Sequence, residues 1–401
     1  MAAAPKKTTR RPAKKKATTK RATTTDNVSD ELRKVLKDLD GIDKDMSLYN
    51  ADIKRGSVAE MSVHSGSYTL DLLFGGGNPA GRMIMLYGPE GGGKSTVALA
   101  GAAAGRRKGA TVYIYDAEGG TDALYAGKLG LDVSGADPLV RLKLPDTGEE
   151  VFEHMVRVMD TLEQHNITYE TMGHPPAIFI IDSLAAMAPS EQVVDGQKRL
   201  GTHARLFSSE MRAIKTILRR TGCVLIAVNQ VRFKIGSYGN PEDTPGGWAP
   251  KFYSDLTVRL GAVKGKTAAV DEVVVDGQMQ YHRYINVVTR KNKVHRPFQK
   301  GSLRLILGEG LDKVYDAVCF LQAVGVIFIA SPGYYHFNGV VKADGELKKL
   351  RMSEVEAEVR ANLRVYRRQC RRMIRTGDAF KRIVSIEAEA TDGDDEDSVE
   401  A

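Results

Sequence analysis

Residues 88–96 read Gly88-Pro89-Glu90-Gly91-Gly92-Gly93-Lys94-Ser95-Thr96. This stretch lies between an apolar run at residues 83–87 and a helix-forming run at residues 96–104. A buried strand that turns into a helix is the context in which the pattern G-x-x-x-x-G-K-[ST] indicates a phosphate-binding loop. The glycines let backbone N–H groups surround a polyphosphate, and the helix N-terminus adds partial positive charge. Lys94 is expected to reach the terminal phosphates and Ser95 to ligate Mg²⁺. The stretch therefore predicts a nucleotide site.

Apolar runs alternate with helical stretches on both sides of this loop. The runs are residues 83–87, 111–115, 177–181, 224–228, 256–260, 284–289 and 303–307. Near-continuous apolar runs are typical of strands that are covered on both faces, as in a doubly wound α/β fold with a mostly parallel sheet. The last runs lie closer together and alternate more, which predicts antiparallel edge strands.

Composition divides the chain into five parts. Residues 1–28 form a basic arm and residues 384–401 an acidic tail, both expected to be disordered. Between them we expect a helix-and-strand segment for self-association at residues 29–62, a nucleotide-binding core at 63–312 and a small C-terminal α+β domain at 313–383. Nine Lys/Arg and no acid lie in residues 1–25, eight Asp/Glu and no base lie in residues 387–401, and the net charge is +8. This pattern suits a protein that handles polyanions.

The C-terminal domain is predicted to end in one strong helix. Ser353 is expected to cap it, Glu356 to complete a capping box and Gly377 to stop it. One face carries an apolar stripe of Val355, Val359, Leu363, Tyr366, Cys370 and Ile374. The other faces carry Arg360, Arg364, Arg367, Arg368, Arg371, Arg372 and Arg375. Two interpretations stay open for these arginines, a solvated surface or a surface that attracts DNA.

No apolar run approaches the ~20 residues that span a bilayer, so no membrane partner is expected. Three widely spaced cysteines, Cys223, Cys319 and Cys370, indicate neither a disulfide framework nor a metal knuckle. The N-terminus lacks the apolar segment of a secretory signal. A cytoplasmic location is the simplest expectation.

Polar side chains follow three of the apolar runs where each predicted strand ends. These are Asp116-Ala117-Glu118, Asp182-Ser183 and Asn229-Gln230. Ligands of a doubly wound sheet bind at the carboxyl ends of its strands. Asp182 is expected to hold Mg²⁺ through water, Glu118 to orient and deprotonate the attacking water, and Gln230 to sense the terminal phosphate. Each residue alone would more often be a helix cap, but the three together favour a catalytic site.

Eight segments in order resemble the bacterial RecA recombinase family. They are GPEGGGKST (88–96), DAEGGTDALYAGKLG (116–130), PDTGE (145–149), IIDSLAAMAP (180–189), NQVRFKIG (229–236), GNPEDTPGG (239–247), KFY (251–253) and KNK (291–293). The resemblance covers roughly residues 56–312. Gly91 and Gly92 stand where bacterial RecA proteins typically have two serines, and the long basic arm is unusual. The sequence therefore resembles a divergent, phage-type RecA-like protein.

The resemblance implies a role for several residues. Asp182 corresponds to the Walker B aspartate, Glu118 to the water-activating glutamate, and Gln230 to the glutamine that couples the γ-phosphate to DNA binding. Asp122 and Tyr125 correspond to adenine contacts. Lys291 and Lys293 resemble a pair that reaches the ATP of a neighbouring subunit. Core packing for Tyr125, and surface charge for the two lysines, stay open as simpler interpretations.

Two polar loops at residues 193–201 and 231–247 are long enough to be functional. In the RecA family the corresponding loops grip single-stranded DNA, with cations on phosphates and apolar side chains against bases. The DNA-contacting residues implied here are Lys198, Arg199, Arg205, Arg212, Arg232, Phe233, Lys234, Ile235 and Tyr238.

By resemblance the chain is a Mg²⁺- and DNA-dependent ATPase that forms helical filaments on single-stranded DNA, pairs it with homologous double-stranded DNA and exchanges strands. Two alternatives stay open at this stage. One is a hexameric motor on the same core, such as a replicative helicase. The other is a DNA-coating protein that binds ATP with little turnover.

Overall fold

The computed structural model describes residues 61–190, 202–233, 242–243, 245, 249–263, 270–342 and 344–386. At residues 202–204, 232–233 and 242–243 only the backbone is considered. The predicted basic arm, nearly all of the 29–62 segment, the first DNA loop, most of the second and all but residues 384–386 of the acidic tail lie outside the described residues. The predicted division into domains is therefore left as a prediction.

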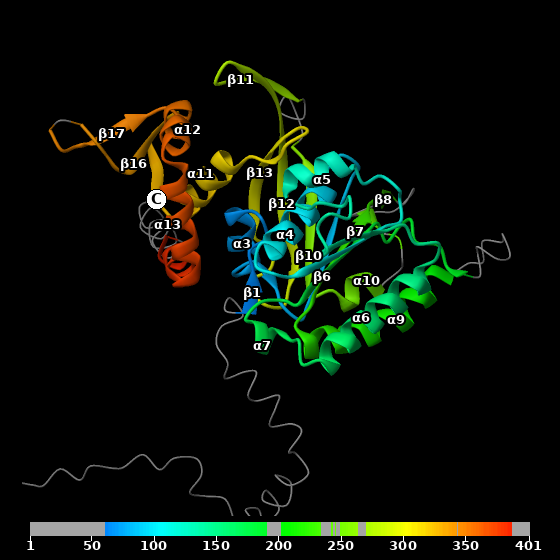
Figure 1. The fold of residues 1–401 in the computed structure, drawn as a ribbon. Coiled ribbons are helices and arrows are strands. Elements are labelled where there is room, and N and C mark those ends of the chain that lie inside the picture. The colour runs from blue at the N-terminus through cyan, green and yellow to red at the C-terminus, as the bar shows by residue number, and fades with distance from the viewer. Residues whose placement is uncertain are drawn as a thin grey trace, which may run out of the picture. The chain divides into compact units, whose positions relative to one another are not determined.

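Within the described residues, ten strands form one sheet (Figure 1). Its order is β14-β13-β12-β10-β3-β7-β6-β4-β5, with β11 paired to β12. The bounds are β3 Met83–Gly88, β4 Thr111–Asp116, β5 Val140–Lys143, β6 Ala177–Asp182, β7 Val224–Gln230, β10 Leu256–Ala262, β11 Asp271–Val275, β12 Gln278–Asn292, β13 Lys300–Ile306 and β14 Gly310–Leu311.

The sheet is parallel from β10 through β3, β7, β6 and β4 to β5. It is antiparallel from β10 through β12 and β13 to β14, and β11 is antiparallel to β12. The predicted α/β fold with a mostly parallel sheet and antiparallel edge strands is confirmed. The strands β5, β11 and β14 were not predicted, because none has a near-continuous apolar run of five residues.

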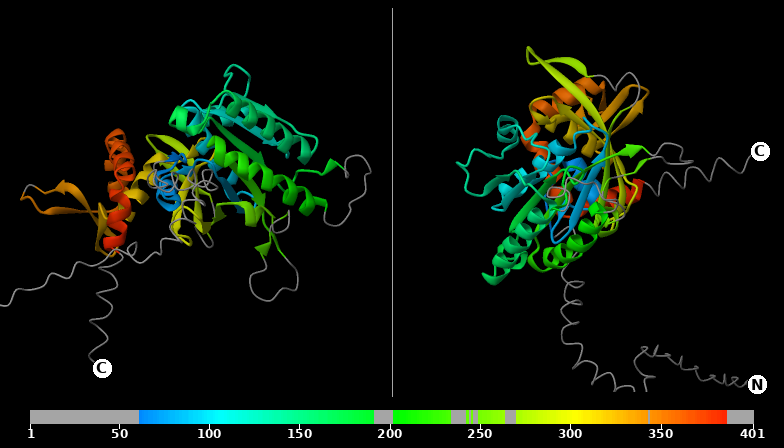
Figure 2. Two further views of the ribbon diagram at one scale, coloured as in Figure 1. Left: turned by 90° about the horizontal axis from the view of Figure 1, so that it is seen from below. Right: turned by 90° about the vertical axis from the view of Figure 1, so that its right-hand side faces the viewer.

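Helices cover both faces of the sheet, and side chains alternate between the two layers. Ile178 and Ile180 face the layer of α4, whereas Phe179 and Ile181 face the layer of α6 and α9. Helices α6 and α9 lie side by side (Figure 2). The helices of the core are α3 Tyr68–Phe74, α4 Lys94–Arg106, α5 Ala123–Leu129, α6 Gly148–Gln164, α7 Tyr169–Met172, α9 Thr202–Thr221 and α10 Ala249–Tyr253. Two small ribbons accompany them, β1 Ser62–Val63 with β2 Asn78–Pro79, and β8 Arg232–Phe233 with β9 Glu242–Asp243.

The last part of the described chain packs a second apolar cluster around α11. The elements are α11 Lys313–Ala323, β15 Ile327–Ser331, β16 Tyr334–Val341, β17 Leu347–Leu350, α12 Met352–Ala361 and α13 Leu363–Arg375. Phe320, Phe337 and Val355 are fully buried in this cluster, which also takes up Tyr68 and Leu72 of α3.

Two polar contacts tie α11 and α12 to the residues that precede them. Asp316 of α11 accepts hydrogen bonds from the backbone N–H groups of Tyr68 (2.7 Å) and Thr69 (3.1 Å), so it caps the start of α3. Arg304 of β13 is buried and donates to Asp312 (2.9 Å) and to both carboxylate oxygens of Glu356 (3.0 and 2.8 Å). Burial of charged groups is tolerated here because they are paired and hydrogen-bonded.

The prediction of one C-terminal helix capped by Ser353 is wrong. Arg351 is the N-cap of α12, Glu354 completes its capping box, and Glu356 pairs with Arg304 instead. The helix also breaks at Asn362, which ends α12 and precedes α13. The apolar stripe does face the cluster, because both helices pack on it, and Gly377 follows α13 with a φ of 73°.

None of the helices that the structure describes combines the length and apolar character that crossing a bilayer requires. Cys223, Cys319 and Cys370 carry free thiols.

Candidate functional site

The loop at residues 88–93 lies between β3 and α4, as its sequence predicts. Gly88 passes so close to β10 that a Cβ would lie 1.8 Å from the carbonyl oxygen of Leu260. Gly93 is the N-cap of α4 with a φ of 76°, and a Cβ there would lie 2.5 Å from Ile285 of β12. Side chains at either position would collide with the sheet, so the glycines hold the loop against it.

The first residues of α4 bring a cation and a hydroxyl to the carboxyl end of the sheet. The Nζ of the buried Lys94 donates to the carbonyl oxygen of Pro89 at 2.8 Å. Burial lowers the pKa of Lys94, and the nearby carboxylates of Asp182, Glu118 and Glu90 oppose that shift. These three carboxylates therefore help to keep the ammonium group charged.

Asp182 stands at the end of β6, next to β7, which is itself next to the P-loop strand β3. Burial raises the pKa of its carboxyl group, while a hydrogen bond with Ser95 and the charge of Lys94 oppose the shift. The carboxylates of Glu118 and Asp116 raise it further. A concentration of negative charge beside a hydroxyl is the kind of oxygen-rich environment that suits Mg²⁺.

Glu118 is held by two donors from neighbouring strand ends. The amide nitrogen of Gln230, at the end of β7, donates to its Oε1 at 2.9 Å. The hydroxyl of Ser183, which follows β6 after a cis peptide bond, donates to the same oxygen. The structure thus brings together Lys94, Ser95, Glu118, Asp182 and Gln230, all predicted from sequence.

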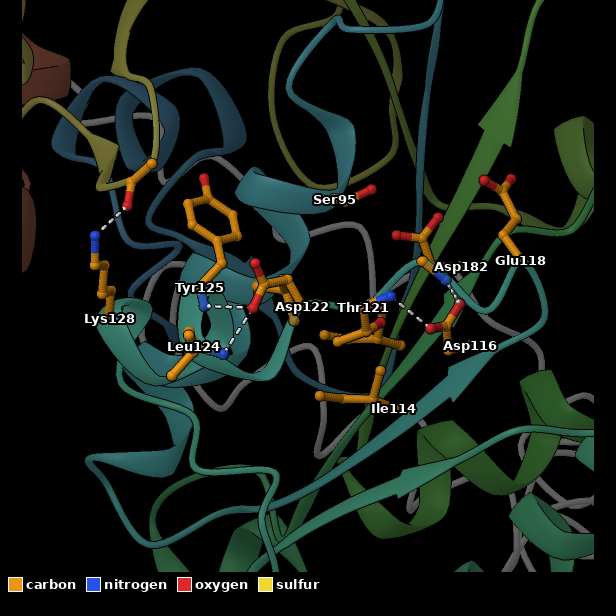
Figure 3. A pocket seen from close by; sticks show the side chains of 14 residues that line it. Ser95, Ile114, Asp116, Glu118, Thr121, Asp122, Leu124, Tyr125, Lys128 and Asp182 are labelled. Atoms are coloured by element: carbon orange, nitrogen blue, oxygen red, sulfur yellow. Dashed lines mark hydrogen bonds between the residues drawn. The ribbon is translucent and has the colours of Figure 1, made fainter.

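A cavity of about 620 Å³ extends from this cluster toward α5 (Figure 3). Tyr125 lines it, and its hydroxyl lies 2.8 Å from that of Thr96. Asp122 caps α5 by accepting from the backbone of Leu124 (2.8 Å) and Tyr125 (3.2 Å). Lys128 donates to the carbonyl oxygen of Gly308 at 3.0 Å. Asp122 and Tyr125, which were predicted as adenine contacts, therefore line one cavity.

A second cavity, of about 380 Å³, lies over the P-loop and shares some of its lining with the first. The residues that line both are Ser95, Glu118, Tyr125, Asp182 and Gly308. Glu90, Lys94, Gln230 and Arg283 line only the second cavity. The two cavities therefore adjoin, one beside α5 and the other over the loop at residues 88–93.

Three site residues had no role in the sequence prediction. Asp116 is buried and accepts from the backbone of Gly120 (3.3 Å) and Thr121 (2.7 Å), so it orders the loop that carries Glu118. Ser183 could have been found, because it follows Asp182 at the strand end. Arg283 had no such signal, since it lies within β12, far from the P-loop in sequence.

Lys291 and Lys293 lie at the opposite end of the sheet. Lys291 pairs with Thr257 of β10, and Thr257 pairs with Met85 in the middle of β3, before the P-loop. The Nζ of Lys291 donates to the carbonyl oxygens of Lys251 (2.8 Å) and Phe252 (2.9 Å) in α10. Lys293 is exposed. The structure does not bring these two lysines to the P-loop of their own chain.

Two of the residues predicted to contact DNA have described side chains. Arg205 and Arg212 are exposed on α9, and the Nε of Arg212 donates to the hydroxyl of Tyr253 at 3.4 Å. The backbones of Arg232 and Phe233 form β8, which pairs with β9 and was not predicted. The remaining predicted contacts, Lys198, Arg199, Lys234, Ile235 and Tyr238, lie outside the described residues.

Comparisons with known proteins agree with this arrangement. The family model described as the RecA N-terminal domain matches residues 33–312. The RecA protein of Nostoc punctiforme is 34% identical over 300 residues, covering 74% of this chain and 77% of the relative. The RecA protein of Thermus thermophilus is 38% identical over 270 residues, covering 66% and 72%. Among solved structures, the crystal structure of the RadB recombinase matches with a TM-score of 0.43 and 21% identity, covering 62% of this chain and 98% of that chain.

Proposed function

The chain belongs to the RecA family, and we propose that it hydrolyses ATP in a DNA-dependent manner while it forms helical filaments on single-stranded DNA and exchanges homologous strands. Membership assigns it a RecA-type function in recombination and repair. Nothing in the comparisons favours the helicase alternative. We also propose the residue roles given below, the hydrolysis of ATP and a cytoplasmic location.

One observation carries the proposed chemistry: Glu118 accepts from both Ser183 and Gln230 at the ends of neighbouring strands. A carboxylate fixed by two donors beside the phosphate cavity can orient a water and take its proton. Gln230 joins Glu118 to the loop that begins at residue 231, which is predicted to contact DNA. A change in that loop would therefore reach the proposed base through one hydrogen bond, which gives DNA a physical route to control hydrolysis.

The donor set of the site fits Mg²⁺. Ser95 and Asp182 supply oxygen ligands that line the same cavity, and carboxylate, hydroxyl and water are the ligands that this ion prefers. Bound Mg²⁺ would neutralise charge on the phosphates. Lys94 binds the same phosphates, Gly88 to Thr96 surround them, and Tyr125 with Asp122 holds the base in the adjoining cavity.

Lys291 and Lys293 are proposed to act on the ATP of a neighbouring subunit. Their distance from the P-loop of their own chain leaves no role for them there, and cations supplied by a second subunit stabilise the transferring phosphoryl in related ATPases. Hydrolysis would then depend on assembly.

Double-stranded DNA is proposed to approach the arginine-rich α13. Burial and the guanidinium groups of Arg367 and Arg371 lower the pKa of Arg107, and burial together with Arg367 and Arg107 lowers that of Lys313. Because these cations repel one another, the surface that they share carries an excess of positive charge. A bound polyanion would reduce this repulsion, which favours the DNA-attracting interpretation over simple solvation.

Electron microscopy with single-stranded DNA and a non-hydrolysable ATP analogue tests the proposed assembly. Helical filaments are expected, whereas closed rings would support a hexameric motor. The rate of ATP hydrolysis, measured with and without single strands, tests the coupling. Turnover that DNA does not stimulate would leave only a DNA-coating protein.

A further inference from the structure

Among the described residues that line the cavity over the P-loop, Arg283 is a cation to which neither the sequence pattern nor the proposed function gives a role. It lies on β12, opposite Leu305 of β13, and is half-buried. Its Nη1 donates to the carbonyl oxygen of Gly91 in the P-loop at 3.2 Å. A residue from a strand far along the chain thus contacts the phosphate-binding loop directly.

The contact is fixed by packing on either side of it. Ile285 lies two positions beyond Arg283, on the same face of β12, and is fully buried. Both Ile285 and Leu305 pack against Gly93. Gly91 has a φ of 66°, and a Cβ there would lie 3.0 Å from Nη1 of Arg283. Glycine at position 91 therefore leaves room for the guanidinium group.

The charges around the P-loop call for a second cation. Among the described residues that line the cavity over this loop, the carboxylates are Glu90, Glu118 and Asp182, whereas the cations are Lys94 and Arg283 alone. A triphosphate would add further negative charge to this cavity. Arginine presents five N–H donors in a planar fork that matches phosphate oxygens, and the hydrogen bond to Gly91 engages one of them.

Arg283 lies at one end of the proposed nucleotide site and not at the other. Asp122, Leu124 and Lys128 line only the cavity on the side of the base, whereas Arg283 lines only the cavity that holds Lys94 and Gln230. On the proposed function, that end receives the terminal phosphate. We propose that Arg283 is a second phosphate-binding cation, supplied by the same chain, and that it makes the site prefer a nucleoside triphosphate to a diphosphate.

This inference rests on the proposed ATP site, and its test separates the two. Calorimetry on the full chain without DNA would measure the affinities for ADP and for a non-hydrolysable ATP analogue. Arg283→Ala is expected to weaken binding of the ATP analogue roughly 10- to 100-fold, the loss of charged hydrogen bonds, and to leave ADP affinity within about threefold. Arg283→Lys, which keeps the charge but not the fork, should lie between.

Arg290→Ala is the matched control, because Arg290 is an exposed arginine on the same strand and is expected to change neither affinity. Equal weakening of ADP and ATP analogue by Arg283→Ala would show that Arg283 only holds the P-loop in place, and an unchanged ATP affinity would show that it does not touch the phosphate. Either result overturns this inference and leaves the proposed function standing. A wild-type chain that binds neither nucleotide would overturn the proposed function, and this inference with it.

Discussion

The two ends of the large sheet are built differently. At the carboxyl end, Glu118, Gln230 and Ser183 are joined by hydrogen bonds, and Lys94 and Asp182 lie within reach of one another's charge. At the opposite end, Lys291 holds two carbonyl oxygens of α10 and Lys293 is exposed.

The difference indicates how much of the active site one subunit contains. The carboxyl end brings together Glu118, Asp182, Ser95 and Lys94, which are proposed above as the base, the Mg²⁺ ligands and a phosphate-binding cation. At the other end the described residues place the carboxylate of Asp255 near Lys291, but they include no phosphate-binding loop beside the two lysines. We infer that a single chain binds the nucleotide with one end and completes a neighbour's site with the other. Each prediction below perturbs one end and leaves the other unchanged.

Lys94→Ala should have the largest effect, because it removes the buried cation of the carboxyl end. Loss of one partner of a desolvated charge pair costs roughly 10²–10⁴-fold in affinity, and all turnover should be lost with it. Lys108→Ala, at an exposed lysine just beyond α4, is the control. Nucleotide binding by calorimetry and thermal unfolding would be measured together. A folded Lys94→Ala chain that binds ATP like wild type would remove Lys94 from the phosphate site.

Lys293→Ala perturbs the other end. It should leave nucleotide binding by the isolated subunit unchanged but lower DNA-stimulated ATP hydrolysis, by up to the roughly 10³–10⁵-fold that a cation supplied from another subunit contributes. Lys349→Ala, at an exposed lysine of β17, should be neutral.

Mixing separates the two ends within one assembly. Lys94→Ala and Lys293→Ala chains are each expected to lose activity, but a mixed filament would contain interfaces that pair an intact P-loop with intact lysines. Some ATP hydrolysis should therefore return on mixing. A mixture that co-assembles on DNA and stays inactive would contradict a site shared between subunits.

Glu118→Gln tests the base at the carboxyl end. Glutamine keeps the size of the side chain but cannot take a proton, so ATP should still bind while hydrolysis falls by roughly 10²–10⁴-fold, the usual contribution of a general base. Filaments should then persist with ATP for longer than those of the wild type. Hydrolysis near the wild-type rate, measured by phosphate release, would show that Glu118 does not activate the water.

A rise in pH through about 8 should weaken the end that carries Lys291. Burial, with the nearby charges of Lys293 and Lys215, lowers the pKa of Lys291 to about 8 from an ordinary 10.5. As pH rises through 8, the folded subunit loses this proton, so cooperative assembly should decline. At pH 9 the unprotonated form of Lys291 should outnumber the protonated form about tenfold. Nucleotide affinity of the isolated subunit should stay level.

The sign for stability is opposite. Between pH 8 and 10.5 the unfolded chain holds a proton on Lys291 that the folded chain has released, so this group favours folding more as pH rises. Lys291→Arg, which stays charged, should make assembly less dependent on pH in this range. An equally steep decline with arginine would assign the effect to another group.

The site residues at the carboxyl end of the sheet could be predicted from the sequence. Its residues follow buried strands directly, and parallel strands end at one edge, so Glu118, Asp182 and Gln230 had to meet once β3, β4, β6 and β7 were predicted. Ser183 was within reach of the same reasoning.

Contacts between distant segments could not be predicted in this way. Arg283 meets Gly91 only because β12 folds back beside β10, and Glu356 pairs with Arg304 rather than with its own helix start. The break at Asn362 was hidden because the apolar stripe continues across it. Asparagine is a weak helix former whose side chain competes for backbone groups, and here it contacts Glu358.

Strand exchange tests the central claim most directly. The wild-type chain would be incubated with a circular single strand, its homologous linear duplex, Mg²⁺ and ATP, and the products separated on a gel. The wild-type chain is expected to form joint molecules and then a nicked circular duplex. Neither product should form with Lys94→Ala or with a heterologous duplex. Filaments that hydrolyse ATP on the single strand yet form no joint molecules with the homologous duplex would contradict this claim.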